Sequence, residues 1–543
     1  MLVFREGRCT IPSAVLLRQL ESAVTAISSQ QTNSADTMLT ALLQAGELEC
    51  ALADAGSEVA QLAAALTDYF ANCLVEKASP PENAVQPLLQ ALSGAPLPLS
   101  LTVSRPEGFA YYALHPLDFV GALVLAGDRP HGAVVVGIRS IGSTLSATVR
   151  AHLSSTRIPC NRFTVRPVGH PFDRRVELSL SERQQVERAI AGDAAFYVVD
   201  EGPGLSGSSF LATAEALLQA GVLSSKISLL CSSQPDCNAL LARNAAERWR
   251  PFRTIQAKAG SHLPADATTF FAAGRWREFC FKDQEEWPAS WLPMERLKFL
   301  SSEERELFRF DGFGAYGSQV RERYARVAEA GYGPPSESAG NGFTQFPMIK
   351  GTVSSRATQP MIERAAEYCA FRSRELAAEV VSNSAVEEMA RVNVERELGW
   401  GVGENFHLEM VRPVIADGKM AMHEWLEPQA GGLALKLDSA AHGDDHFFPG
   451  PTDIAWDLAG AIIEWQMDES AADEFARRYE RLANDRVRAR LRPYQIAYAA
   501  FRMGYSKMAA AAMFGQEEEN RFRREYNFYK EILARMLALR AVV

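Results

Sequence analysis

The sequence predicts an α/β unit on a parallel sheet, with a helical arm before it and an α+β unit with a helical C-terminal part after it. Three observations support this fold class. The chain has 543 residues, which is more than one hydrophobic core usually supports. Short β-branched runs alternate with Ala- and Leu-rich stretches over residues 100–260, the pattern of a parallel sheet with crossover helices. Residues 452–543 are charged and show helical periodicity almost throughout.

The first predicted unit is a helical arm over residues 1–98. Apolar residues recur at helical spacing within residues 15–24 and 59–66, as they do in amphipathic helices. Prolines interrupt this pattern at 78–83 and again at 95–98, and proline fixes φ and removes a backbone donor. A new unit is therefore expected to follow.

The second predicted unit spans residues 99–280 and the third spans residues 294–543. The second unit contains short apolar runs that are rich in β-branched residues. The strands expected from these runs are residues 132–138, 195–199 and 226–230. Because helical segments separate them, the strands should run parallel through right-handed crossovers. The polar stretch 282–293, which carries two prolines, marks the boundary before the third unit.

Charge and hydropathy exclude several classes of function. The net charge is −10, from 56 Lys and Arg against 66 Asp and Glu, so neither nucleic acid nor a membrane surface is an expected partner. No apolar run reaches the ~18 residues of a membrane span. Glu6 and Arg8 lie where a signal peptide needs apolar residues, which favours a cytoplasmic protein. The eight cysteines show no C-x-x-C pair and are assigned no function.

The sharpest chemical motif follows the strand expected at residues 195–199. Asp200 and Glu201 come directly after that strand, and open α/β sheets bind ligands at the carboxyl ends of their strands. The next turn is rich in small residues, whose backbone N–H groups suit a phosphate monoester. Its candidate phosphate-binding residues are Gly204, Ser206, Gly207, Ser208 and Ser209. Two acids beside a phosphate cradle suit a sugar phosphate; the alternative is that the acids only cap a helix.

This motif resembles the signature of the type I phosphoribosyltransferases, in which two acids after a strand precede a short spacer and Thr-Gly-x-Thr. Here residues 206–209 read Ser-Gly-Ser-Ser, and the spacer 202–205 is one residue longer than usual. The resemblance covers about residues 105–250. It implies that Asp200 and Glu201 are catalytic and hold the ribose hydroxyls through or beside Mg²⁺, with 5-phosphoribosyl pyrophosphate as a substrate.

Two further segments resemble parts of the same family. Residues 134–146 resemble its pyrophosphate-binding loop, which implies that Arg139 and Ser140 bind phosphate. Residues 157–175 occupy the place of its mobile hood over the substrate. The hood residues that the resemblance implies are Arg162, Arg166, His170 and Arg174.

A second group of chemical residues lies between residues 407 and 457. Four of the nine histidines fall there, and acids are interleaved with them. Such crowding is expected at a metal or proton-transfer site. The alternative is a satisfied polar network or a solvated face. The stripe of Trp456, Leu458, Ile462, Ile463 and Trp465 is interpreted as the core face of a helix.

Residues 297–530 resemble the aminoglycoside phosphotransferase-type small-molecule kinases. The resemblance implies that Asp417 is the catalytic acid and that Asp438 binds Mg²⁺, with Asp457 at the start of a later helix. Ile415 and Met422 stand where the family has a His and a metal-binding Asn. The other candidate metal ligands are His423, Glu424 and Asp444. Arg309 stands where the ATP-anchoring Lys is expected, Glu322 would lie on the next helix, and 342–351 resembles the hinge between lobes.

Together the resemblances imply a bifunctional transferase with ATP and 5-phosphoribosyl pyrophosphate as co-substrates and Mg²⁺ as cofactor. Its ligands would be small molecules or nucleotides, and a homodimer is possible. Two alternatives remain open. One is a nucleotide sensor with a non-catalytic phosphoribosyltransferase-like module and a pseudokinase module, which the departures at Arg309 and Met422 favour. The other is an assembly scaffold formed by the helical arm and the C-terminal helices.

Overall fold

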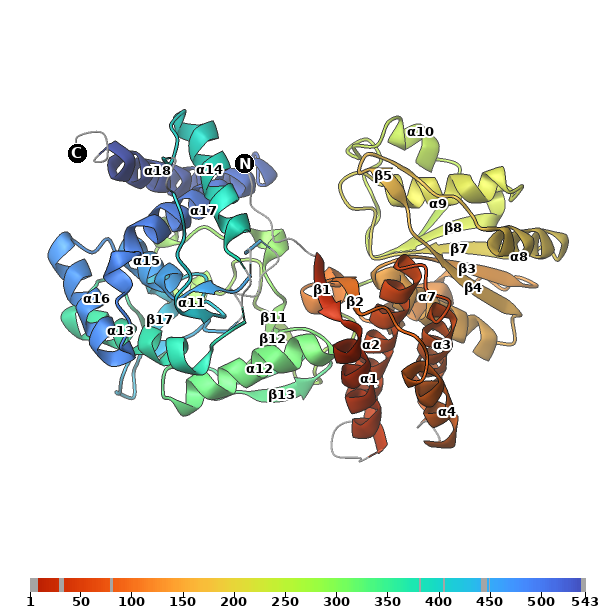
Figure 1. Cartoon of the computed structure of the whole chain (residues 1–543), viewed down its shortest axis with the longest axis horizontal. Helices are drawn as coiled ribbons and strands as arrows, with labels where there is room; N and C mark the ends of the chain where they lie inside the picture. The colour runs from red at the N-terminus through yellow and green to blue at the C-terminus, as the bar shows by residue number, and fades with distance from the viewer. Residues whose placement is uncertain are drawn as a thin grey trace.

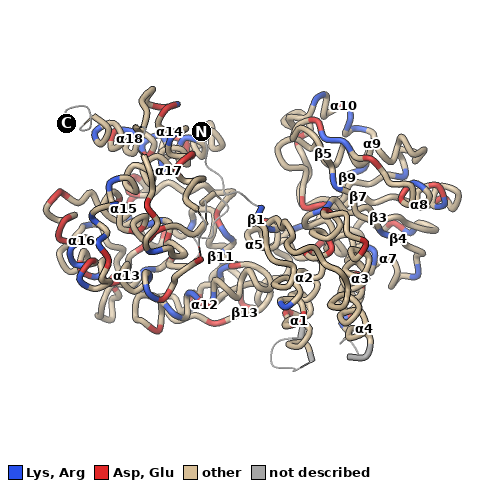
Figure 2. The backbone as a smooth tube through the Cα atoms, in the orientation of Figure 1, with Lys and Arg blue, Asp and Glu red and all other residues tan. Residues whose placement is uncertain are grey.

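The computed structural model describes residues 8–28, 34–78, 82–379, 382–403, 406–440, 447–448 and 450–538. The chain forms two bodies that lie side by side (Figure 1). The first body comprises residues 8–257 and the second comprises residues 269–538. Lys and Arg residues are interspersed with Asp and Glu residues along both of them (Figure 2). Among the helices of the described residues, none combines the length and the hydropathy that a bilayer crossing requires.

A five-stranded parallel sheet forms the centre of the first body. Its strands are β3 (Ala133–Ile138), β4 (Cys160–Val165), β7 (Ala195–Val199), β8 (Ile227–Cys231) and β9 (Arg253–Gln256). They lie in the order β4-β3-β7-β8-β9, which is 2-1-3-4-5 in chain order and typical of doubly wound sheets. The three predicted strands are confirmed, and β4 and β9 are additional. The strand order reverses between β3 and β7, where such sheets form their ligand crevice.

Helices cover both faces of this sheet. On one face lie α6 (Pro116–Ala126) and α7 (Ile141–Ser155), and on the other α8 (Leu180–Ala191), α9 (Ser208–Gln219) and α10 (Ala245–Trp249). Alternate strand residues therefore join different cores: Val135 packs on the α7 side and Val136 on the α9 side. A small antiparallel hairpin, β5 (Val168–His170) with β6 (Asp173–Arg175), follows β4.

The helical character predicted for residues 1–98 is present. The helices are α1 (Ser13–Ser28), α2 (Ser34–Asp54), α3 (Ala60–Glu76) and α4 (Glu82–Ser93). A strand that was not predicted precedes them, since β1 (Arg8–Pro12) pairs antiparallel with β2 (Ser100–Ser104). Buried residues of these four helices share one hydrophobic core with α7 and the sheet. The arm is therefore a packed third layer of the first body, and a short helix, α5 (Glu107–Ala110), follows β2.

The second body begins with an antiparallel sheet in the order β10-β11-β12-β14-β13. Its strands are β10 (Thr269–Phe270), β11 (Lys298–Leu300), β12 (Glu306–Phe310), β13 (Glu337–Gly340) and β14 (Phe343–Pro347), with α12 (Gly314–Glu329) between β12 and β13. Residues 348–350 then lead to a separate sheet of β15 (Gly351–Val353), β17 (Trp425–Pro428) and β18 (Leu435–Lys436). Residues 348–350 of the predicted hinge (342–351) thus connect the two sheets, whereas its residues 343–347 form β14.

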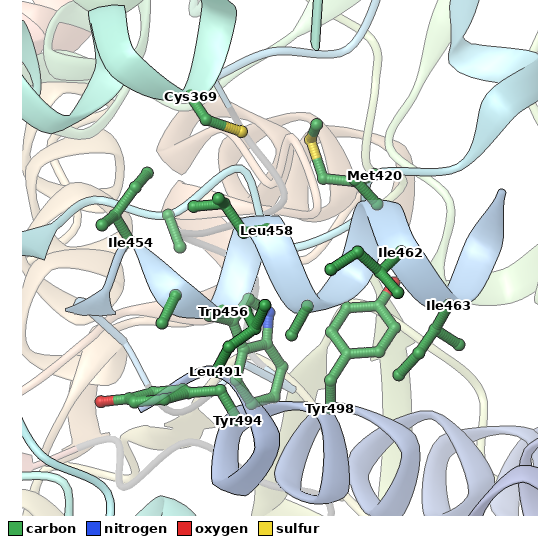
Figure 3. Packing of buried hydrophobic residues seen from close by; sticks show 14 of the residues in the cluster. Cys369, Met420, Ile454, Trp456, Leu458, Ile462, Ile463, Leu491, Tyr494 and Tyr498 are labelled. Carbon is green, nitrogen blue, oxygen red and sulfur yellow. The ribbon is translucent and has the colours of Figure 1, made fainter. Parts of the chain in front are cut away.

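Helices form the rest of the second body. They are α13 (Gln359–Glu375), α14 (Ser384–Leu398), α15 (Ala455–Glu464), α16 (Glu469–Ala483), α17 (Leu491–Ala512) and α18 (Glu517–Ala538), with the bridge of β16 (Pro413–Val414) and β19 (Thr452–Asp453) among them. The apolar stripe predicted for α15 is confirmed as a core face. Trp456, Ile462 and Ile463 pack beside Tyr498 of α17 in a core that is closed to solvent (Figure 3).

Truncation of Trp456 is predicted to destabilise the second body severely. Trp456 is fully buried between α15 and α17, so Trp456→Ala leaves a large cavity. The free energy of unfolding should fall by about 3–5 kcal/mol, measured by urea denaturation. Trp400→Ala is the control, because Trp400 is 46% exposed and should cost no more than about 0.5 kcal/mol. Equal effects of the two variants would contradict the burial of Trp456.

Candidate functional site

The two predicted phosphate motifs of the first body meet at one edge of the parallel sheet. Arg139 and Ser140 follow β3, and Asp200 and Glu201 follow β7, its neighbour in the sheet. The first turn of α7 is held against the end of β7, since a Cβ on Gly142 would lie 2.7 Å from the carbonyl oxygen of Val199. The edge where they meet is the point at which the strand order reverses.

Ser140 adopts a strained backbone conformation in this loop. Its φ is 133°, a region that L-residues with a Cβ rarely occupy. Strain of this kind costs about 1–3 kcal/mol and is typical of ligand-binding loops that the surrounding structure holds in place. Here α7 begins at the next residue and packs against the sheet, which fixes the loop.

Asp200 and Glu201 are half-buried acids with little compensating charge. Burial raises the pKa of Asp200 to about 7 and that of Glu201 to about 8, where repulsion by Asp200 adds to the effect. The Oδ1 atom of Asp200 accepts a hydrogen bond from the Glu201 N–H (2.8 Å), and Glu201 accepts one from the N–H of Gly108 in α5 (3.1 Å). Within the described part of the chain, neither carboxylate forms an ion pair. Two adjacent carboxyl groups of this kind are suited to bind a cation or the hydroxyl groups of a sugar.

The predicted phosphate turn has the backbone that a tight loop before a helix requires. Gly204 and Gly207 have φ of 59° and 69°, and α9 begins at Ser208. The hydroxyls of Ser206 and Ser208 donate to the carbonyl oxygen of Pro171, at 2.9 and 2.6 Å. Pro171 is in the turn of the β5–β6 hairpin, so the hairpin lies against the turn and both hydroxyls are engaged. The Ser209 carbonyl accepts from Thr213 within α9.

The structure divides the predicted hood residues into two groups. His170 and Arg174 lie in the β5–β6 hairpin, where Arg174 donates to the carbonyl oxygen of Pro167 (3.1 Å). The prediction that Arg162 belongs to the hood is wrong. Its side chain, in β4, is 3% exposed and pairs with Glu49 (2.7 Å) and Asp68 (2.8 Å) of the arm.

Arg139 and Arg166 are likewise paired with an acid of the arm. Both guanidinium groups contact the carboxylate of Asp54, each with a 3.0 Å hydrogen bond to its Oδ1 atom. Sequence reasoning missed Asp54, Glu49 and Asp68, because pairing over 85 to 113 positions leaves no local signal.

In the second body, Asp457 positions the loop that carries Asp417. Its two carboxylate oxygens accept hydrogen bonds from the N–H groups of Asp417 (2.9 Å) and Gly418 (3.2 Å). Arg372 lies 3.3 Å from Asp457. Asp457 was predicted as the start of a helix, and it does lie in the first turn of α15. Its contact with the loop is a further role that the sequence did not show.

Asp417, the predicted catalytic acid, is buried and neutralised. It is 1% exposed; the Tyr368 hydroxyl donates to it at 2.6 Å, and the ammonium of Lys436 lies 3.2 Å away. Lys436 is fully buried and also donates to Glu424 (2.7 Å). Sequence reasoning did not single out Lys436. The available signal was one lysine within the otherwise apolar residues 433–437.

Asp438 lies beside the predicted ATP-binding residue Arg309. Arg309 donates to Asp438 at 2.7 Å and to Asp311 at 2.8 Å. The expectation that Glu322 lies at this site is wrong, because Glu322 is on the exposed face of α12. Tyr324 on the buried face of α12 contacts both Arg309 and Asp438 instead.

The predicted metal ligands do not form a cluster. Among the described residues, no group of three or more His, Cys, Asp or Glu side chains is arranged to hold a metal ion. Glu424 pairs with Lys436, and His423 stacks on Trp276 with an interplanar angle of 21°. Their roles as metal ligands stay predictions. Asp444 lies outside the described residues.

A cavity of about 580 Å³ separates the antiparallel sheet from the rest of the second body. Leu307 and Phe346 line it from the sheet, and Leu426 and Leu437 line it from the other side. The charged residues on its wall include Arg309, Asp438, Lys298 and Lys419. The segment between β10 and β11 contributes aromatic residues, Trp276 and Trp291 among them. The cavity is therefore a slot whose lining combines apolar and charged side chains, which suits a nucleotide.

No protein-family model and no curated protein matches this chain. Solved structures match it in part. A choline/ethanolamine kinase family protein from Mesorhizobium loti is 15% identical, with 45% of this chain and 88% of that chain covered and a TM-score of 0.31. Choline kinase LicA from Streptococcus pneumoniae is 13% identical, with 44% of this chain and 90% of that chain covered and a TM-score of 0.28. Macrolide 2'-phosphotransferase MphH from Brachybacterium faecium is 11% identical, with 43% of this chain and 88% of that chain covered and a TM-score of 0.29.

These matches cover less than half of the chain. With TM-scores of 0.28–0.31 they assign neither a family nor a substrate to it, and the kinase resemblance stays a prediction. The phosphoribosyltransferase resemblance stays a prediction, for which the five-stranded parallel sheet is the structural counterpart.

The environment of His423 predicts how stability depends on pH. Burial holds the pKa of this imidazole at about 3, well below its ordinary value of 6.5. The unfolded chain therefore takes up a proton that the folded chain does not, and stability is lost as the pH falls from about 6.5 towards 3. His423→Gln should remove up to about 2 kcal/mol of the loss between pH 6.5 and 5, measured by urea denaturation at each pH. If the free energy of unfolding of wild type and variant fell equally over this pH range, the low pKa of His423 would be contradicted.

Proposed function

We propose that the chain is a bifunctional transferase. The first body transfers a phosphoribosyl group from 5-phosphoribosyl pyrophosphate to a base or another small-molecule acceptor. The second body binds ATP and phosphorylates a hydroxyl group. The observation that supports the first activity best is the meeting of Asp200 and Glu201 with the loop of Arg139 and Ser140 at the strand-order reversal.

In the first site the two acids would hold the ribose hydroxyls and the 204–209 turn would hold the 5'-phosphate. Asp200 and Glu201 are suited to hold Mg²⁺ as well, because they are adjacent carboxylates without an ion pair among the described residues; the ion would neutralise charge on the departing pyrophosphate. As the bond from ribose to pyrophosphate breaks and the bond to the acceptor forms, fixed donors stabilise the leaving group. Arg139 and the N–H groups of its loop would act as these donors.

In the second site the slot between Leu307 and Leu437 would hold the adenine of ATP. Arg309 and Asp438, which also line the slot, would lie beside the phosphates. A single carboxylate such as Asp438 fits Mg²⁺ that is held mainly by the phosphates of the nucleotide and by water. Asp417 would orient the attacking hydroxyl, as in other phosphoryl transfer enzymes.

A second candidate, a binding module without turnover, is favoured by one specific observation. Asp417 is fully buried and its two oxygens face Tyr368 and Lys436. An acid in such a network accepts a substrate proton only after the network rearranges. Retention of ATP binding with no ADP formation would favour this second candidate for the second body.

The first activity predicts a selective effect of Asp200. Calorimetric titration of 5-phosphoribosyl pyrophosphate with Mg²⁺ should show binding to wild type and at least tenfold weaker binding to Asp200→Ala. Asp236→Asn is the control, since Asp236 is an exposed acid that follows β8 at the same edge of the sheet. Equal binding by wild type and Asp200→Ala, or none by wild type, would rule out the proposed first site.

The second activity predicts a matching effect of Asp438. ATP with Mg²⁺ should bind wild type, and binding to Asp438→Ala should be at least tenfold weaker. Asp468→Asn serves as the control, because Asp468 caps the exposed start of α16 and asparagine also caps helices. ADP formation is then measured with choline and a macrolide as acceptors, and Asp417→Asn should abolish it in an otherwise active protein. Failure of wild type to bind ATP would exclude the second activity.

A further inference from the structure

Asp54 occupies an electrostatically unfavourable position at the end of α2. It is the last residue of that helix, and a negative charge at a helix C-terminus is repelled by the helix dipole. Two cations compensate for this placement. The Nη1 atom of Arg139 and the Nε atom of Arg166 each donate to Asp54 Oδ1 at 3.0 Å, and Arg166 makes a second contact with Oδ2.

The two arginines belong to the edge of the sheet where the first site lies. Arg139 directly follows β3, and Arg166 directly follows β4, its neighbour in the sheet. Arg166 also acts on Asp200, since its positive charge offsets part of the rise in the pKa of that acid that burial causes. Asp54, Arg166 and Ser140 line one small cavity of about 30 Å³. Asp54 therefore lies in the wall of the first site, although it comes from the helical arm.

Arg139 and Arg166 resemble an anion-binding site that the carboxylate of Asp54 already occupies. A guanidinium group binds the oxygens of a carboxylate and of a phosphate with the same fork of N–H donors. The side chains are partly accessible, with 18% exposure for Arg139, 26% for Arg166 and 29% for Asp54. An incoming ligand thus has access to the pair without unfolding the surrounding helices.

We infer that Asp54 is an internal competitor for the pyrophosphate of the ligand: its carboxylate takes the place of phosphate oxygens on Arg139 and Arg166 until the ligand displaces it. This inference rests on the proposed function of the first body. Its consequence is quantitative, because the ligand binds only the fraction of molecules in which Asp54 has released the arginines. Asp54 acts through these arginines and touches no reacting atom, so it is a regulatory residue of the site.

The test is calorimetric titration of inorganic pyrophosphate into the full chain. Asp54→Asn removes the charge and keeps the shape of the side chain. It should bind pyrophosphate about tenfold more tightly than wild type, as expected when a competitor that fills the site for about nine-tenths of the time is removed. Asp54→Glu keeps the charge and should bind no more tightly than wild type. Melting curves show which variants are folded, and Asp54→Ser replaces Asp54→Asn if the latter does not fold.

Asp68→Asn is the matched control. Asp68 is also 29% exposed and also pairs with two arginines, Arg150 and Arg162, but Arg162 is buried under the arm. This variant should bind pyrophosphate as wild type does. Binding to Asp54→Asn that equals or falls below wild type would overturn the inference and leave the proposed function intact. If neither wild type nor Asp54→Asn bound pyrophosphate, the inference and the proposed function would both be overturned. Binding of pyrophosphate to Asp54→Asn alone would show complete autoinhibition and support the inference.

Discussion

The arrangement of the second site depends on how one aromatic face of the antiparallel sheet is buried. Phe308 and Phe310 point to one face of β12 and join the core formed by the arm and α7. Because side chains alternate along a strand, Leu307 and Arg309 must point to the other face, where they line the cavity. Residues of the first body pack against the aromatic face and so join the two bodies. The same packing contact fixes which face of β12 is buried, and it thereby places Arg309 beside Asp438.

Helix α2 is the element that this contact and the first site have in common. Near its start, Asp36 accepts a hydrogen bond from the N–H of Asn341, between β13 and β14 (2.9 Å). Glu47 receives one from the Tyr316 hydroxyl of α12 (3.3 Å). Its last residue, Asp54, reaches the arginines of the parallel sheet. One rigid helix therefore contacts both sheets, and its last residue lies in the wall of the first site.

The sequence was informative where a feature is local. Strands of the parallel sheet, the acids that follow β7 and the core stripe of α15 were all predicted, because each depends on residues within one short window. Long-range pairing was not predicted. Arg162 was placed in a hood, since its partners Glu49 and Asp68 come from another helical layer. The pairing of Glu424 with Lys436 was not predicted, because nothing local shows that Lys436 folds back onto it. Glu322 was placed at the ATP site because the local pattern does not show that Tyr324, two positions further along α12, is the side chain that reaches Arg309.

The shared core also has a consequence for how the chain is made. During synthesis, the apolar residues of α2 leave the ribosome about 290 residues before Phe343 of β14, which completes their packing. At about 5–20 residues per second, that interval is roughly 15–60 s. Throughout this time, part of the surface of α2 that later meets the antiparallel sheet is exposed to water and to other nascent chains. The joint between the two bodies is thus the part of the molecule that depends most on protection by chaperones.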